Sequence, residues 1–557
     1  MKKIILLYAV LLLTMMVSCK KFLDTPPLTN LSGDSFYKSP SDLEYAVNGM
    51  YASFRELEGD GAPYMDILVD LLFLKNSWEA GFFPATNGSL TADNWWIRDN
   101  WKAKYTKIRN INNFFANVDK FQGQLEQSKL DNYRGQARVI RAFLYTRLLQ
   151  GYGEVPLITT PIPLETLPAK NNLEEIINFI MTEFDKSINE LPETSSDSKH
   201  GHLTKYAAYV LKARAAMYIA GFYNKPEYYK TAADALQKVV SSGQFSLFRK
   251  YNDPNRDFGD LFLEENEGNE NKEILLSYQF MKDLSPNSIT TVFAGPGWKG
   301  FQAHQNYIDL FECKEGWQAY GISFAAMNRY RDTKSNKSPL EGVYPGYDPN
   351  NEFANRDPRL AQTFFNPNIH SQGGTILKPG EYWKPANRTF SPDADNDAYF
   401  FKKMVEPSNF NPVYYYNNSA NNYILIRYAD VLLLYAEALN ATGHTGEALP
   451  YLNDVRSRAG MPPVTAGGSD ELLEIIKHER KVELIQEQQL YWDYKRWKDF
   501  ERTMPFGAVF YGYRRENFGQ PSQAMETKKL IYPKYYTWPI PVEELQVNSN
   551  LSQNKDW

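Results

Sequence analysis

The side chains that could catalyse hydrolysis are numerous in this chain, but they follow no catalytic pattern. Its 557 residues include 66 Asp and Glu, six His and two Cys. A glycoside hydrolase needs two carboxylates about 5 to 9.5 Å apart, and so many candidates do not single out a pair. Neither the Gly-x-Ser-x-Gly turn of serine hydrolases nor the His-Glu-x-x-His zinc motif is present in the sequence. A secreted glycosidase therefore stays an alternative without identifiable catalytic residues.

An acidic stretch, DADND, resembles the start of a metal-binding loop. Its Asp393, Asp395 and Asp397 match the first ligands of an EF-hand calcium loop. Ala398 stands where that loop needs glycine, and Met404 stands where it needs glutamate. We therefore interpret the stretch as an acidic turn and expect no metal or other cofactor.

Two other charge-dense stretches are interpreted as structural. Glutamates at positions 264, 265, 267 and 270 stand among Asn and Gly and predict a solvated loop. The stretch KHERKVELIQEQ, residues 477 to 488, has acidic and basic residues three and four positions apart. This spacing predicts a helix that carries local ion pairs, so we expect neither stretch to do chemistry.

Aromatic residues offer a different chemistry, that of binding. They make up 15% of the chain, with 38 Tyr, 33 Phe and 11 Trp, and most must belong to the core. A sugar has apolar C–H faces and polar edges, so a sugar site needs exposed rings beside Asn, Asp or Arg. Candidates in loop-like stretches are Asn76, Trp78, Trp95, Trp96, Trp298, Trp317, Tyr320 and Trp383. Trp298 stands out because it follows Gly-Pro-Gly, whereas Trp101 is at helical spacing to Tyr105 and is expected in the core.

The N-terminus has the plan of an export signal. Lys2 and Lys3 precede an apolar run over residues 4 to 17, which is short of the roughly 20 residues that a membrane-spanning helix needs. We predict a signal peptide over residues 1 to 18 and no later spanning segment. The net charge of −5 favours neither nucleic acid nor an anionic membrane surface as a partner.

Cys19 directly follows this apolar run. Met16, Val17, Ser18 and Cys19 resemble the lipobox of bacterial lipoproteins, in which the cysteine is acylated and becomes the first mature residue. The resemblance implies a lipid anchor at Cys19, because two or three acyl chains hold a protein on a membrane where one is marginal. The alternative is an ordinary signal peptide with an unrelated cysteine. If Cys19 is acylated, Cys313 has no internal partner and is expected to be a buried free thiol.

Pairs of helices are predicted on both sides of the middle of the chain. Apolar residues recur at helical spacing over residues 133–153 and 172–192, 204–223 and 227–243, and 427–443 and 446–460. Small residues such as Ala208, Ala215 and Ala436 stand where such helices would cross. Irregular pairs of this kind are typical of tetratricopeptide-like units, which must stack to bury their apolar faces.

Residues 245 to 420 are rich in Gly, Pro, Asn and aromatics, which predicts loops and short strands with a functional role. The predicted fold is therefore mainly α, with an irregular lobe on a helical scaffold. The expected organisation is a tether over 19–38 and one domain over 39–557, whose scaffold covers about 39–244 and 421–557 and whose binding lobe covers about 245–420.

Several motifs, taken in order, resemble the SusD/RagB family of surface lipoproteins from Bacteroidetes-type nutrient-uptake systems. They are CKKFLDTPP, FYKSPSDLEYAVNGMYASF, WKAKYTKIRNINNF, GQARVIRAFLYTRLLQGYGEVPLI, RDPRL, YILIRYADVLLLYAEALN, ALPYLNDVRSRAG, HERKVELIQEQQLYWDYKRW and TWPIPVEELQVNSNLSQN. One departure begins at Glu487, where the family usually reads Glu-Gly-x-Arg and this chain reads Glu-Gln-Gln-Leu.

The resemblance implies a mainly helical SusD-like fold with tetratricopeptide-like units below an irregular binding lobe. It also implies a non-catalytic glycan-binding protein of the outer membrane, exposed at the cell surface, that acts as a lid on a SusC-like TonB-dependent transporter. A peptide ligand is the alternative within the family. Family members bind ligand from the region of Trp298, which makes that residue the first candidate.

Overall fold

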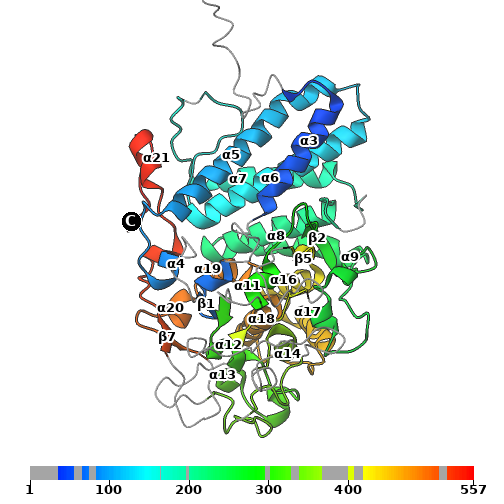
Figure 1. Cartoon of the computed structure of the whole chain (residues 1–557), viewed down its shortest axis with the longest axis vertical. Coiled ribbons are helices and arrows are strands. Elements are labelled where there is room, and N and C mark those ends of the chain that lie inside the picture. Colours follow the sequence, from blue (N-terminus) through cyan, green and yellow to red (C-terminus); the bar gives the residue numbers. More distant parts are fainter. Residues whose placement is uncertain are drawn as a thin grey trace, which may run out of the picture.

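Helices make up most of the secondary structure of the chain, and the strands are short (Figure 1). The computed structural model describes residues 36–55, 65–74, 83–163, 165–195, 200–294, 301–327, 338–349, 351–366, 399–406, 418–512 and 524–557. Within these ranges, no helix is both long and apolar enough to span a lipid bilayer. The prediction of a mainly α fold is confirmed.

The longer helices come first and last in the chain, and short helices and strands lie between them. The helices are α3 (Pro40–Met50), α4 (Phe83–Asn87), α5 (Trp95–Asn117), α6 (Gln127–Tyr152), α7 (Leu173–Glu190), α8 (Lys205–Phe222), α9 (Glu227–Ser241), α10 (Asp257–Asp260), α11 (Ile289–Ala294), α12 (Gln305–Leu310), α13 (Phe324–Met327), α14 (Arg359–Thr363), α16 (Tyr428–Ala441), α17 (Thr445–Arg458), α18 (Ser469–Leu484), α19 (Leu490–Trp497), α20 (Phe500–Thr503) and α21 (Val542–Val547). The strands are β1 (Leu72–Leu74), β2 (Ile274–Tyr278), β3 (Phe301–Ala303), β4 (Tyr399–Phe400), β5 (Tyr423–Arg427), β6 (Val509–Tyr511) and β7 (Ala524–Thr527).

The predicted helical pairs are present. Helix α6 packs against α7, α8 against α9, and α16 against α17, and the pairs join through contacts of α7 with α8 and of α9 with α16. Local signals set the helix starts: Asn172 and Glu175 form a reciprocal capping box at α7, and the Thr204 hydroxyl accepts the Ala207 N–H at α8. The pairs therefore stack into one helical scaffold.

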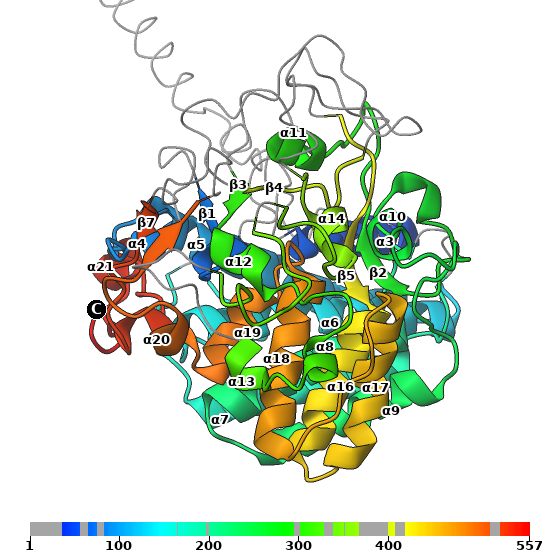
Figure 2. The same ribbon diagram turned by 90° about the horizontal axis from the view of Figure 1, so that it is seen from below.

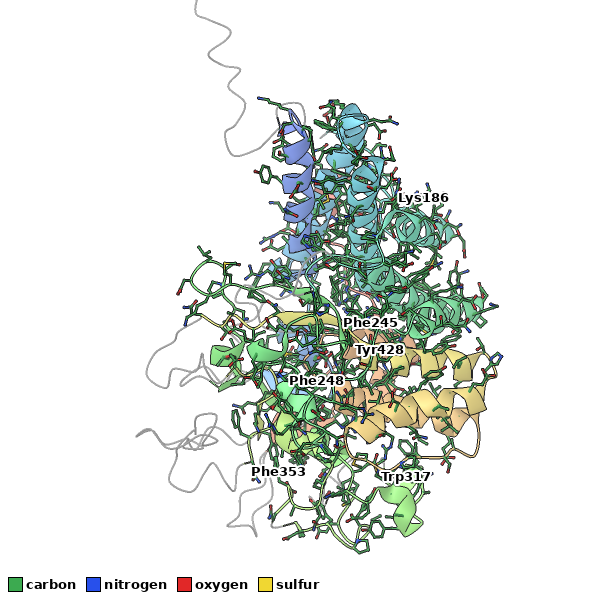
Figure 3. All side chains as sticks on the ribbon, turned by 90° about the vertical axis from the view of Figure 1, so that its right-hand side faces the viewer. Lys186, Phe245, Phe248, Trp317, Phe353 and Tyr428 are labelled. Carbon is green, nitrogen blue, oxygen red and sulfur yellow. The ribbon has the colours of Figure 1, made fainter. Side chains whose placement is uncertain are left out.

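Small residues allow these helices to approach closely. Ala207, Ala208 and Ala215 of α8 are buried. At Gly221, near the end of α8, an added Cβ would stand only 2.6 Å from the carbonyl oxygen of Arg496 in α19. Apolar and aromatic contacts fill the remaining space, as where Phe245 stacks on Tyr428 with their centroids 6.3 Å apart (Figure 3).

The strands form small antiparallel sheets. Strand β3 pairs with both β1 and β4, β2 pairs with β5, and β6 pairs with β7. Leu74, the last residue of β1, is the register partner of Phe301, the first residue of β3. Figure 2 shows β1, β3, β4 and α11 on the side of the molecule opposite α7, α9 and α17.

Most charged residues of α18 are buried, and their ion pairs are mostly with distant segments, whereas the sequence predicted local pairs; Lys477 and Glu474 form one such local pair at 2.9 Å. The helix itself is confirmed, but Glu479, Arg480 and Glu483 are at most 1% exposed. Their partners come from distant segments: Arg359 of α14 lies 2.5 Å from Glu479, and Asp430 of α16 lies 2.8 Å from Arg480. Spacing along one helix could not show that other helices would cover this face.

The acidic stretch before β2 also differs in part from its prediction. Glu265 and Glu270 are exposed, as a solvated loop requires, but Glu267 is buried. The carboxylate of Glu267 accepts a hydrogen bond from the backbone N–H of Asn422, just before β5. Glu267 therefore connects this loop to the scaffold.

The departure from the family motif at Glu487 falls on a turn and not on a helix. Helix α18 ends at Leu484 and α19 begins at Leu490. Within the turn, Gln486 and Gln488 have φ values of 68° and 58°. This is the left-handed region that favours glycine, and Gln488 is where the family usually has its glycine.

Candidate functional site

Four of the predicted site residues lie within the described ranges, and the structure does not bring all four together. Trp95 and Trp96 begin α5, whereas Trp317 and Tyr320 bound a 3-10 turn before α13, at the far end of the molecule from α5 (Figures 1 and 3). Asn76, Trp78, Trp298 and Trp383, and also Cys19, lie outside the described residues.

Trp317 lies in the core, while Tyr320 is partly exposed. The Trp317 ring is 3% exposed and packs edge-on against Phe324, with centroids 5.6 Å apart. Tyr320 is 36% exposed and lies edge-on to Tyr344. A buried ring presents no face to a ligand, so Trp317 anchors its loop in this structure. Trp101 is likewise buried, as predicted.

A cavity of about 220 Å³ lies beside Trp95 and Trp96, and we call it the Trp95 pocket. Residues one turn apart on α5 form one wall, the 3-10 turn that follows α3 and the described segment from Met65 form the rim, and α6 and α19 lie behind. The lining residues are Ser53, Arg55, Met65, Trp95, Trp96, Asp99, Asn100, Ala103, Lys104, Lys107, Leu144, Arg147, Trp492 and Trp538. The pocket therefore combines segments that are hundreds of residues apart.

Capping of α5 positions the two tryptophans of the pocket. The side chain of Asn94 accepts a hydrogen bond from the Trp96 N–H at 2.9 Å, which fixes the first turn of the helix. Trp96 is buried edge-on against Trp538, with centroids 4.9 Å apart. Trp95, its neighbour on the helix, is 50% exposed. Trp95 thus offers an open ring beside a rigid aromatic wall.

The polar lining of the pocket consists mostly of hydrogen-bond donors. Arg147 lies over the Trp492 ring at 4.8 Å and donates to Gln150 at 2.7 Å. Lys107 donates to the Ala52 carbonyl at 3.1 Å. These contacts hold the long side chains in place around an aromatic surface, an arrangement suited to binding a polar ligand with apolar faces.

The described lining holds a single carboxylate, Asp99, which pairs with Arg98 at 2.8 Å. Asp66, next to Met65 of the rim, is fully buried, and burial raises its pKa to about 7. Its carboxylate does not line the pocket and accepts the Gln488 N–H at 3.2 Å. Glycoside hydrolysis needs two facing carboxylates, and the described lining supplies one of them.

Three candidate residues that lie outside the described ranges are close in sequence to the β1–β3 sheet. Leu74 and Phe301 face each other in the register; Asn76 and Trp78 follow Leu74 by two and four residues, and Trp298 precedes Phe301 by three. The sheet is firmly seated at its base, where the buried His304 ring stacks between Phe73 and Phe510 at 5.1 and 4.9 Å. Burial and the Lys528 ammonium lower the pKa of His304 to about 3, so the imidazole is neutral.

Metal and thiol chemistry receive no support from the described part of the chain. No group of three or more His, Cys, Asp or Glu side chains there could hold a metal ion. Asp393, Asp395 and Asp397 lie outside the described residues. Cys313 is a buried free cysteine, as predicted, and burial raises its pKa to about 11.

Sequence reasoning missed the deeper part of the Trp95 pocket. Arg147, Trp492 and Trp538 lie in segments quoted as family motifs, but nothing in those segments indicates a site. Trp492 and Trp538 are about 400 residues beyond Trp95 in the chain, and only the fold brings them together. An aromatic-lined pocket on a stacked helical scaffold is an arrangement suited to holding a ligand.

Comparisons with known proteins agree with this architecture. A profile of the SusD family matches residues 266–557, and a profile described as "Starch-binding associating with outer membrane" matches residues 21–217. A SusD-like protein of Formosa agariphila is 26% identical over 572 residues, covering 100% of this chain and 99% of its own. A SusD-like protein of Bacteroides ovatus is 25% identical and covers 97% of this chain and 92% of its own.

Solved structures show the same fold. A SusD-like protein of Bacteroides fragilis superposes with a TM-score of 0.77 at 23% identity, covering 96% of this chain and all of its own. A SusD-like carbohydrate-binding protein of the same species gives a TM-score of 0.75 at 25% identity, covering 93% of this chain and all of its own. A laminarin-binding SusD-like protein gives 0.66 at 19% identity, covering 94% of this chain and all of its own. The chain belongs to the SusD family.

Proposed function

We propose that this protein is a lipid-anchored surface protein of the outer membrane that captures oligosaccharide and passes it to a SusC-like TonB-dependent transporter, without catalysing a reaction. The observation that carries the proposal is the half-exposed Trp95 ring at the rim of a pocket lined by aromatic and polar side chains. Family membership and the carbohydrate-binding neighbour at 25% identity support glycan as the ligand class.

Capture needs only non-covalent contacts. The open Trp95 ring stacks on the apolar C–H face of a sugar, and Asn100, Lys104 and Asp99 bond to hydroxyls at its edge. Trp96 is held edge-on by Trp538, so this aromatic wall beside Trp95 is fixed before a sugar binds. Affinity for such an open site is expected to be about −4 to −8 kcal/mol, that is, millimolar to micromolar.

The end of the β1–β3 sheet supports a second contact region. Trp78 and Trp298 are four and three residues from the paired Leu74 and Phe301. We include Asn76, Trp78, Trp298 and Trp383 in the proposed ligand-binding region.

Calorimetry with purified protein and its variants tests this function. The titrants are malto- and laminari-oligosaccharides, chosen from the descriptions of the similar proteins, and an oligopeptide panel. Trp95→Ala is expected to weaken oligosaccharide binding about tenfold, the effect of losing roughly 1.4 kcal/mol of stacking. Trp298→Ala tests the second region in the same way. Phe506→Ala removes an exposed ring that does not line the Trp95 pocket, 68% exposed against 50% for Trp95, and should leave binding unchanged.

Three outcomes would contradict the proposal. Unchanged affinity in both Trp95→Ala and Trp298→Ala would mean that neither region binds the sugar. Binding of peptides alone would favour the peptide receptor. Release of sugar products that a single carboxylate substitution abolishes would favour the glycosidase.

A further inference from the structure

Helix α5 has a second, separate concave surface on its other face. A groove of about 570 Å³ lies between α5, the segment of residues 156–168 and α21, and we call it the α5 groove. Its volume is within the range of binding pockets. The α5 residues that line it run from Arg98 to Asn112, which are fourteen positions apart, so the groove is about 21 Å long at 1.5 Å per helical residue.

Hydrogen bonds from α5 hold one wall of the groove. The Tyr105 hydroxyl donates to the Pro156 carbonyl at 2.8 Å, and the Asn112 amide donates to the Ile158 carbonyl at 2.9 Å. These contacts satisfy carbonyl groups of a segment that has no helix or strand of its own. The wall is therefore fixed before any ligand arrives.

The opposite wall is held from the C-terminal region. The Asn548 amide donates to the Pro168 carbonyl at 2.8 Å, and the Asn550 amide donates to the Leu167 carbonyl at 2.7 Å. With both walls fixed, a ligand would lose little free energy to ordering the site. The groove is thus a preformed surface.

The apolar character of the groove suits protein side chains better than sugar. Its exposed apolar groups are aliphatic: Ile162, Leu167 and Val547 are 38%, 39% and 73% exposed. Its tryptophan, Trp101, is buried and presents no open ring. Sugar sites depend on exposed aromatic rings, whereas aliphatic rims pack against apolar side chains of a partner.

Positive charge along the rim of the groove indicates that the partner segment carries negative charge. Lys102 and Arg109 are exposed on α5 and line the groove, and neither has a carboxylate within salt-bridge distance in the described structure. Their positions are seven residues apart, about 10 Å along the helix axis, which equals about three residues of extended chain. At the other rim, burial and then the Glu543 carboxylate raise the pKa of Glu544, and the nearby Lys102 ammonium opposes that shift. Glu543 lies 3.6 Å from Arg98, so Lys102 and Arg109 are the exposed lining cations that no salt bridge pairs with a carboxylate within the described residues.

We propose that the α5 groove docks an extended apolar segment of a partner protein, with two carboxylates about three residues apart facing Lys102 and Arg109. The inference is independent of oligosaccharide binding, because the lining of the Trp95 pocket includes none of the α5 groove residues. It assigns a function to the face of α5 that points away from that pocket.

Two labelled hexapeptides test this proposal by fluorescence anisotropy. The acidic probe is Leu-Glu-Pro-Ile-Glu-Leu, and its basic counterpart has lysine at both glutamate positions. The native protein is expected to bind the acidic probe at least tenfold more tightly than the basic one. The double variant Lys102→Glu, Arg109→Glu should reverse that preference. The control Lys230→Glu, Lys238→Glu, on exposed positions of α9, makes the same change in charge and should behave as the native protein does.

Specific results would overturn the proposal. One is no binding of either probe up to about 1 mM, the weak limit of useful affinity. Another is a change in probe preference in the α9 control that equals the change in the α5 variant. If the native protein forms concentration-dependent dimers and the α5 variant does not, a second copy of the chain occupies the groove. If the native protein binds anionic vesicles and the α5 variant does not, the groove contacts a membrane. Oligosaccharide affinity, measured on the same variants, should not change, so failure here is separate from failure of the proposed function.

Discussion

Glu483 is the residue on which three arginines from different parts of the chain converge. Its carboxylate accepts from Arg427 of β5 at 2.6 Å, from Arg359 of α14 at 2.9 Å, and from Arg458 at the end of α17. Burial alone would raise the pKa of Glu483, but these guanidinium groups outweigh it and hold the pKa well below its usual range. The group is therefore ionised and pairs segments from the irregular region with the scaffold.

Glu483→Gln should destabilise the protein by about 3 to 5 kcal/mol, because it leaves buried guanidinium groups without their counter-charge. Urea unfolding followed by circular dichroism measures the change. Glu474→Gln on the same helix is the control, since Glu474 lies in exposed pairs and should cost less than about 1 kcal/mol. Equal unfolding midpoints for the two variants would show that the buried cluster does not stabilise the fold.

At the residue scale, sequence reasoning identified residue types better than their surroundings. Trp95 and Trp317 had equal standing as aromatics in loop-like stretches, but one is half-exposed and the other is in the core. Glu267 looked like its exposed neighbours Glu265 and Glu270. In each case, segments that are distant in the chain determine whether the side chain is buried, and the local sequence does not show which segments those are.

At the scale of elements, the turn between α18 and α19 contains a local conflict that a substitution can relieve. Gln488 has a φ of 58°, and its buried side-chain oxygen has no hydrogen-bond partner among the residues that the structure describes. Gln488→Gly is expected to stabilise the protein by about 1 kcal/mol, because glycine adopts left-handed φ without steric cost. Thermal unfolding measures this gain.

Gln489→Gly is the matched control for that turn. Gln489 has an ordinary φ of −95°, so glycine there only adds flexibility to the unfolded chain and should cost about 0.5 to 1 kcal/mol. A loss of stability in both variants would mean that the packing of the Gln488 side chain outweighs its backbone strain.

Helices were the elements best predicted from sequence. The three pairs from α6 to α17 have an apolar spacing that acts within a few positions, and α7 and α8 also have capping residues, so a single sequence contains the signal. The strands were not located, because β1, β3 and β4 have only two or three residues each. Strand β1 pairs with β3 more than two hundred residues away, and β3 pairs with β4 about one hundred residues away; no periodicity reveals such contacts.

At the scale of the whole molecule, the tether, the domain boundaries and the lipid anchor at Cys19 all stay predictions. Of these, the anchor most affects the proposed function. A lid on a transporter must stay at the membrane yet be free to move, and a lipid at the end of a Pro-containing tether allows both. The apolar core that the structure describes begins at Leu43. Loss of the anchor should therefore leave the folded body and its Trp95 pocket unchanged.

Cys19→Ala should release the protein from the membrane fraction while its unfolding midpoint and oligosaccharide affinity stay as in the native chain. Cell fractionation, with mass spectrometry of the N-terminal peptide for acyl groups, measures the release. Cys313→Ala is the matched control because it removes the other cysteine, a buried free thiol, and should stay membrane-bound. Retention of Cys19→Ala in the membrane without an acyl group would mean that another surface holds the protein there. In that case the α5 groove, with its exposed Val547 and its cationic rim, would be the first surface to test for membrane contact.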